Sequence, residues 1–76
     1  MNKTKTELKK IAQLALDSEY GFAPELEEIT LLEACSDGTK IYFEVNGEEY
    51  KFTSYINTYG DMRTIWIGKG TIEKLS

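Results

Sequence analysis

The dipeptide Asn46-Gly47 constrains the fold of this chain more than any other feature of its sequence. Both residues suit the positive φ angles of a type I′ turn, and the residues around them alternate between apolar and polar side chains. A two-residue loop here predicts an antiparallel hairpin with three pairs on its core face: Val45 with Glu48, Phe43 with Tyr50 and Ile41 with Phe52. The opposite face then carries two further pairs, Tyr42 with Lys51 and Glu44 with Glu49.

An amphipathic helix is predicted near the N-terminus, over residues 4–20. Five apolar residues share one face when successive residues are turned by about 100°: Leu8, Ile11, Ala12, Ala15 and Leu16. Thr4 and Glu7 match a capping box, in which each side chain binds a free backbone amide of the first turn. Gly21 suits the left-handed residue that ends a helix, and Pro24 opposes its continuation.

A further strand is expected over residues 26–34, joined to the hairpin by the turn Ser36-Asp37-Gly38. The length of this turn decides which residues face the core. A three-residue loop places Ile29 and Leu31 there, whereas a two- or four-residue loop substitutes Leu32 and Ala34. Of these alternatives, we expect Ile29 and Leu31.

The last strand is expected over residues 63–68, after a loop at 57–61. Alternation places Ile65 and Ile67 on one face of this strand and Trp66 on the other. The tail from 71 to 76 is too short for an assignment. The sum is a single domain over residues 1–76 with an α+β fold, in which one N-terminal helix packs on a four-stranded antiparallel β-meander. A helix on one face leaves the opposite face open to solvent or a partner.

The residue inventory excludes several classes of enzyme. The chain has no histidine, which removes the commonest general base and the Ser-His and Cys-His nucleophile pairs. The single Cys35 cannot form an internal disulfide. Glu44 and Glu49 are close enough to share a cation, but the chain lacks the oxygen-rich loop of a calcium site. We therefore expect no enzyme, no cofactor and no metal.

The compartment follows from the same inventory. No apolar run exceeds three residues, whereas a signal peptide core needs about 7 and a spanning helix about 20. A secreted domain of this size usually carries several cysteines. The sequence thus predicts a cytoplasmic protein without a membrane partner.

The acidic residues are distributed unevenly. Residues 1–16 carry a net charge of +3 (four Lys, one Glu), residues 17–49 a net charge of −9 (ten acids, one Lys) and residues 50–76 a net charge of +2 (four basic, two acidic residues). The predicted hairpin brings Glu44, Glu48 and Glu49 together at its turn. The net charge of −4 opposes direct binding of nucleic acid.

Aromatic residues are expected on the sheet face away from the helix. Alternation places Tyr42 and Trp66 there, together with Tyr55 if the third strand continues in register. Such aromatics can stabilise a small sheet, and they are also enriched in protein interfaces. The candidate partner-binding residues are thus Glu44, Glu48, Glu49, Tyr42, Tyr55 and Trp66.

These features favour a small acidic protein-binding module that occludes a partner with a basic, nucleic-acid-binding surface. In size and charge the chain resembles small inhibitor proteins of phages and mobile elements, a resemblance of composition that assigns no residues. The alternative is a structural or assembly protein that associates with itself through its exposed sheet face or an edge strand. For the first class we expect a monomer or a weak homodimer, because Glu44 and Glu49 near a two-fold axis would repel their copies.

Overall fold

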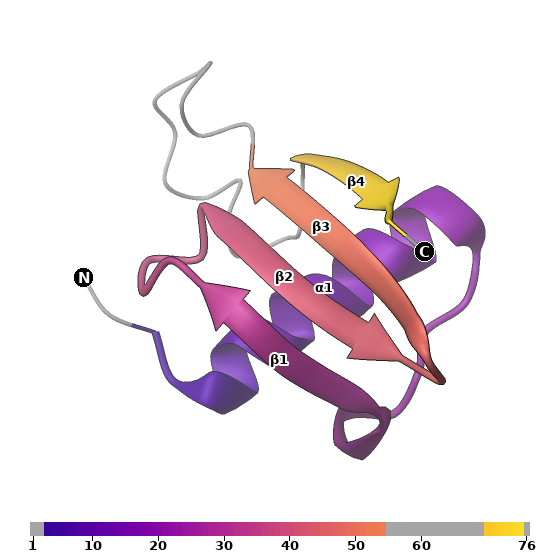
Figure 1. Cartoon of the computed structure of the whole chain (residues 1–76), viewed down its shortest axis with the longest axis horizontal. Helices are drawn as coiled ribbons and strands as arrows, with labels where there is room; N and C mark the ends of the chain where they lie inside the picture. Colours follow the sequence, from indigo (N-terminus) through magenta and orange to yellow (C-terminus); the bar gives the residue numbers. More distant parts are fainter. Residues whose placement is uncertain (1–2, 55–69, 76) are drawn as a thin grey trace.

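The computed structural model describes residues 3–54 and 70–75 and has the α+β architecture that the sequence predicts. Its elements in chain order are the helix α1 (Lys5–Tyr20), the short 3-10 helix η1 (Leu26–Glu28) and the strands β1 (Ile29–Ala34), β2 (Lys40–Val45), β3 (Glu48–Ser54) and β4 (Gly70–Lys74). The strands form one antiparallel sheet in the order β1-β2-β3-β4. Helix α1 lies across one face of this sheet (Figure 1).

Both ends of α1 are capped as the sequence predicts. The amide of Glu7 donates to Thr4 Oγ1 over 3.1 Å, and the amide of Thr4 donates to Glu7 Oε1 over 2.8 Å. At the other end Gly21 has a φ of 77° and donates its amide to the carbonyl of Asp17. These bonds satisfy backbone groups that a helix end leaves without partners, so they fix where α1 begins and ends.

The hairpin at Asn46-Gly47 is confirmed in turn and register. Asn46 has a φ of 52° and Gly47 a φ of 82°, as a type I′ turn requires. The observed pairs of β2 with β3 are Val45 with Glu48, Glu44 with Glu49, Phe43 with Tyr50, Tyr42 with Lys51 and Ile41 with Phe52. The hydrophobic core lies between this hairpin and α1, and its largest fully buried side chains are Phe43, Phe52, Ile11, Leu16, Ile29 and Ile41.

Strand β1 begins at Ile29 and not at residue 26 as predicted, because Leu26–Glu28 form η1. It combines the two registers that the sequence left open. The loop is four residues long, since the Cys35 amide donates to the carbonyl of Lys40 over 2.8 Å. Ala34 therefore pairs with Ile41 and packs against the core. A register shift between Leu31 and Glu33 then leaves Leu32 exposed and returns Leu31 and Ile29 to the core side. This bulge is why the expected pair Ile29 and Leu31 is correct, although the three-residue loop used to derive it is wrong.

The strand beside β3 lies in the tail that the sequence left unassigned. β4 pairs antiparallel with β3, so that Phe52 lies opposite Ile72 and Ser54 opposite Gly70. The prediction that the fourth strand of the meander is 63–68 is therefore corrected to Gly70–Lys74. Residues 63–68 lie outside the described residues, as do Tyr55 and Trp66. Gly70 has a packing role, because a Cβ there would collide with the backbone oxygen of Thr53.

Candidate functional site

The carboxylates of the acidic segment gather at one end of the molecule. The C-terminal end of α1, the segment 21–28 and the turn between β2 and β3 all lie at this end, while the start of α1 and the turn between β1 and β2 lie at the other (Figure 1). Eight carboxylates belong to the first group, which we call the acidic end: Asp17, Glu19, Glu25, Glu27, Glu28, Glu44, Glu48 and Glu49. The fold therefore concentrates in space a charge that is already concentrated in sequence.

The two remaining acids of the segment lie toward the opposite end of the sheet. Glu33 is on β1 beside the first turn, and Asp37 is inside that turn. The backbone amide and the hydroxyl of Thr39 both donate to Asp37 Oδ1, at 3.0 and 2.8 Å. These hydrogen bonds lower the pKa of Asp37 from its ordinary value. Asp37 thus has a structural role in the turn.

Glu44 and Glu49 lie directly opposite one another on the sheet face away from α1, which we call the open face. Both side chains are half-buried, and the residue across from Glu44 on β1 is Thr30, which is uncharged. Like charges in direct register destabilise an antiparallel pair. This pair therefore destabilises the hairpin, and among the described residues no cation in register offsets the repulsion.

Glu48 occupies the other face of the hairpin, although it lies at the same end. Its Oε2 accepts a hydrogen bond of 2.8 Å from the Tyr50 hydroxyl, and its Oε1 lies 3.3 Å from Lys74 Nζ. The hydrogen bond from Tyr50, followed by the contacts with Lys74, lowers the pKa of Glu48. Glu48 is thus partly neutralised and does not share a surface with Glu44 and Glu49.

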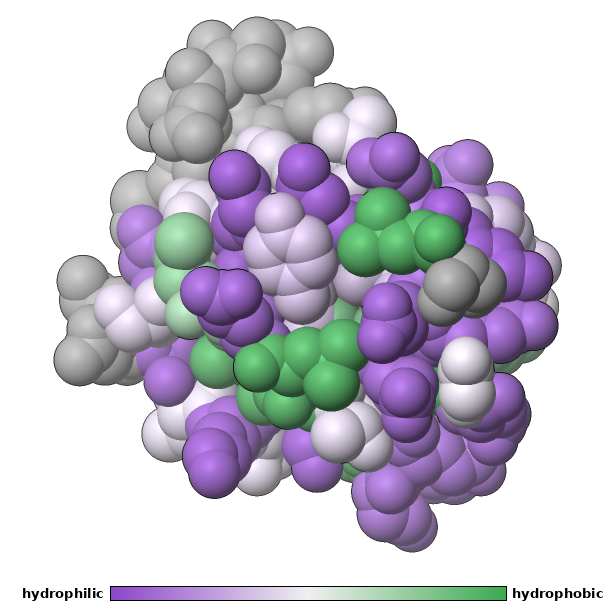
Figure 2. Space-filling model, in the orientation of Figure 1, coloured by the Kyte–Doolittle hydropathy of each residue, from purple (hydrophilic) through white to green (hydrophobic). Residues whose placement is uncertain are grey.

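Tyr42 lies on the open face as predicted, but charged residues surround it. The register aligns Glu33, Tyr42, Lys51 and Glu73 in one row across the four strands, and Lys51 Nζ lies 5.9 Å from the centre of the Tyr42 ring. Figure 2 shows this face as mainly hydrophilic, with one hydrophobic patch over β1, where Leu32 is exposed, and a second near the end of β4, which Leu75, also exposed, directly follows. In the described part of the chain, the open face is therefore a mixed-charge surface rather than an aromatic one.

A pair of exposed aromatic rings at the acidic end is not among the residues that the sequence singled out. The rings of Tyr20 and Phe22 have centres 6.4 Å apart, and 45% and 41% of their surface is exposed. They follow from local structure, because Gly21 in the left-handed conformation separates them and ends α1. The signal available in the sequence is an aromatic residue on each side of a helix-ending glycine.

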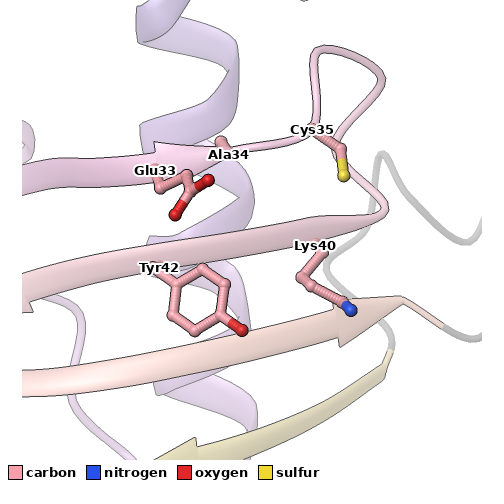
Figure 3. A pocket seen from close by; sticks show the side chains of 5 residues that line it. All are labelled: Glu33, Ala34, Cys35, Lys40 and Tyr42. Atoms are coloured by element: carbon pink, nitrogen blue, oxygen red, sulfur yellow. The ribbon is translucent and has the colours of Figure 1, made fainter.

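A shallow depression of about 100 Å³ lies near the first turn and is lined by Glu33, Ala34, Cys35, Lys40 and Tyr42 (Figure 3). It is at the end of the sheet opposite the acidic end. Within residues 3–54 and 70–75, no three His, Cys, Asp or Glu side chains are grouped so as to hold a metal ion. No helix of the described chain is both long enough and apolar enough to cross a membrane.

In comparisons with protein-family models, curated proteins and solved structures, no match to this chain is found.

Proposed function

We propose that this protein is a small cytoplasmic binding module that occludes a basic, nucleic-acid-binding surface of another protein. The observation that carries the proposal is the gathering of eight carboxylates at one end of the molecule, two of them in direct register on the open face. This end attracts a basic surface at long range, and its carboxylates compete with phosphates for the Lys and Arg side chains of that surface.

Placing these charges together lowers the stability of the fold. Glu44 opposite Glu49 destabilises the hairpin, and a domain of this size stays soluble with only a modest net charge. Lys51, the nearest cation in the neighbouring row, lies over Tyr42. A basic partner supplies the compensating charge that, among the described residues, no cation in register provides for Glu44 and Glu49.

Binding rather than catalysis is the role we propose. Catalytic groups are expected to converge in a pocket with perturbed pKa values. The ionisable groups that line the described depression are Glu33, Cys35, Lys40 and Tyr42. Among the described residues, the structure shows no hydrogen bond through which an acid or base would activate one of them.

The experiment is affinity capture from a lysate of the source cells, with the wild type and a Glu44→Lys/Glu49→Lys variant as parallel baits. We expect the wild type to retain a basic protein at low salt and to release it at about 0.5 M salt. The variant should not retain this protein. In a purified system, added wild type should then displace nucleic acid from this captured protein. A captured protein whose affinity ignores salt and both charge reversals would contradict the proposal.

A matched control separates the acidic end from net charge alone. Glu33→Lys and Glu49→Lys make the same change of charge on the open face, but Glu33 lies in the neighbouring row, on β1, with β2 between it and Glu49, and is not part of the acidic end. We expect Glu49→Lys to weaken capture and Glu33→Lys to leave most of it. Equal losses would show that the partner responds to total charge rather than to this surface.

Self-association is a second candidate, favoured by the exposed Leu32 on β1, which ends the described sheet. Against it, the bulge at Leu32 interrupts the regular edge that strand pairing needs, and Glu44 and Glu49 would face their copies on the open face. We therefore expect a monomer at micromolar concentration by light scattering. A tight dimer that Leu32→Lys dissociates would favour the assembly role instead.

A further inference from the structure

The exposed pair Tyr20 and Phe22 is firmly connected to the core. The Tyr20 ring lies 6.0 Å from the ring of Tyr50, which in turn stacks on the buried Phe43 at 5.4 Å and 18°. The Phe22 ring also contacts the Tyr20 ring, with an angle of 34° between the two ring planes. The pair is thus linked by ring contacts through Tyr50 to the buried Phe43, while much of its own surface faces solvent.

Three exposed carboxylates lie next to this pair in the chain. Asp17 and Glu19 belong to the last turn of α1, and Glu25 follows Phe22 by three residues, which span at most about 11 Å. The side chain of Gln13 donates to the carbonyl of Pro24 over 2.7 Å and so ties the segment after α1 back onto the helix. Within the described chain, none of these three carboxylates forms an ion pair.

We propose that Tyr20 and Phe22 bind an arginine side chain of the partner, while Asp17, Glu19 and Glu25 pair with basic residues beside it. This inference rests on the proposed function, because it requires a basic partner. Arginine fits better than lysine, since its planar and weakly hydrated guanidinium stacks on aromatic rings. The carboxylates exclude an anionic ligand by repulsion. Aromatic anchors ringed by polar groups are the usual centres of binding energy in protein interfaces.

The test uses two synthetic peptides of equal length and charge, one alternating Arg with Gly and one alternating Lys with Gly, titrated by calorimetry at low salt. We expect the wild type to bind the Arg peptide about three- to tenfold more tightly than the Lys peptide. Phe22→Leu keeps an apolar side chain but removes the ring, so it should abolish this preference. Tyr20→Phe keeps the ring and should retain it. Leu32→Ala removes an equally exposed apolar side chain elsewhere and should change neither affinity.

The outcomes distinguish this inference from the function on which it rests. Equal binding of both peptides by the wild type, or an arginine preference that survives Phe22→Leu, would overturn the inference but leave the acidic end as a binding surface. Binding of neither peptide would overturn both. An unchanged melting temperature for Phe22→Leu shows that a loss of preference comes from the ring and not from unfolding.

Discussion

Tyr50 connects the core to the acidic end within a single side chain. Its ring is buried and stacks on Phe43, while its hydroxyl donates to Glu48 at the surface. Burial, and after it the hydrogen bond to Glu48, raises the pKa of Tyr50 to about 12 from an ordinary value of 10.0. The folded protein therefore holds the neutral phenol in a pH range where the unfolded chain loses the proton.

This pKa predicts how stability depends on alkaline pH. The contribution of Tyr50 is fully present below pH 10 and is lost as the pH rises toward 12, because only the unfolded chain releases the proton in that window. Urea unfolding at several pH values should show that Tyr50→Phe loses less stability between pH 10 and 12 than the wild type. Tyr42→Phe, on the open face, is the control and should follow the wild type. Parallel curves for all three proteins would mean that Tyr50 titrates normally in the fold.

Phe43, whose ring stacks on that of Tyr50, allows a test of core packing. Its side chain is fully buried between the sheet and α1. Phe43→Ala removes a ring from a close-packed site and should lower the free energy of unfolding by about 3 to 5 kcal/mol. Most of the stability of so small a domain would then be lost. Tyr42 is the neighbouring residue and lies on the open face, so Tyr42→Ala should lower the free energy of unfolding by less in the same denaturation experiment. A similar loss for both variants would contradict the faces assigned to these two residues.

For the helix and the strands, the sequence predicts those features that interactions between nearby residues determine. Thr4 with Glu7 and the dipeptide Asn46-Gly47 each determine a conformation within a few residues, and both are observed. The bulge at Leu32 depends on a four-residue loop and on core packing acting together, so alternation alone does not show it. β4 depends on pairing across 20 residues, from Phe52 to Ile72, and its short run carries little alternation of its own.

Gly70 provides a test of this long-range pairing. A Cβ at Gly70 would meet the backbone of Thr53 and Ser54 and the ring of Phe52, which β3 cannot move without losing its own pairs. Gly70→Ala should therefore destabilise the protein by about 1 to 3 kcal/mol and reduce the hydrogen-exchange protection of β4 more than that of β2. Gly47→Ala is a useful comparison, because that position is open in space and strained only by its φ. Unchanged protection of β4 in Gly70→Ala would contradict the close contact.

Part of the candidate surface could also be predicted from the sequence. The run of acids over 17–49 and the register of the hairpin place Glu44 opposite Glu49, as observed. The same register assigns Glu48 to the other face, but its partners Tyr50 and Lys74 depend on β4 and so could not be foreseen. The alternation of residues along strands also gives no information about Tyr20 and Phe22, because these two residues are brought together by the end of a helix. Tyr55 and Trp66 lie outside the described residues, and their role stays a prediction.

In the molecule as a whole, the buried apolar side chains of the described residues form a core between α1 and the sheet. Cys35 is a free, exposed thiol, and the described residues contain no group placed to hold a metal. We therefore expect the melting temperature to be the same within a few degrees with and without a chelator or a reductant. A large drop with chelator would reveal a metal site, and a drop with reductant would reveal a disulfide between two chains through Cys35.

The proposed function requires that the folded chain presents its negative charge at one end. The most direct measurement is an NMR titration of the labelled protein with a short oligolysine peptide at low and high salt. We expect the amide shifts to concentrate at residues 17–28 and 44–49, to spare the turn at 35–39 and the first turns of α1, and to fade as the salt concentration rises. Shifts centred on that turn or on the start of α1, or shifts that persist at high salt, would contradict it.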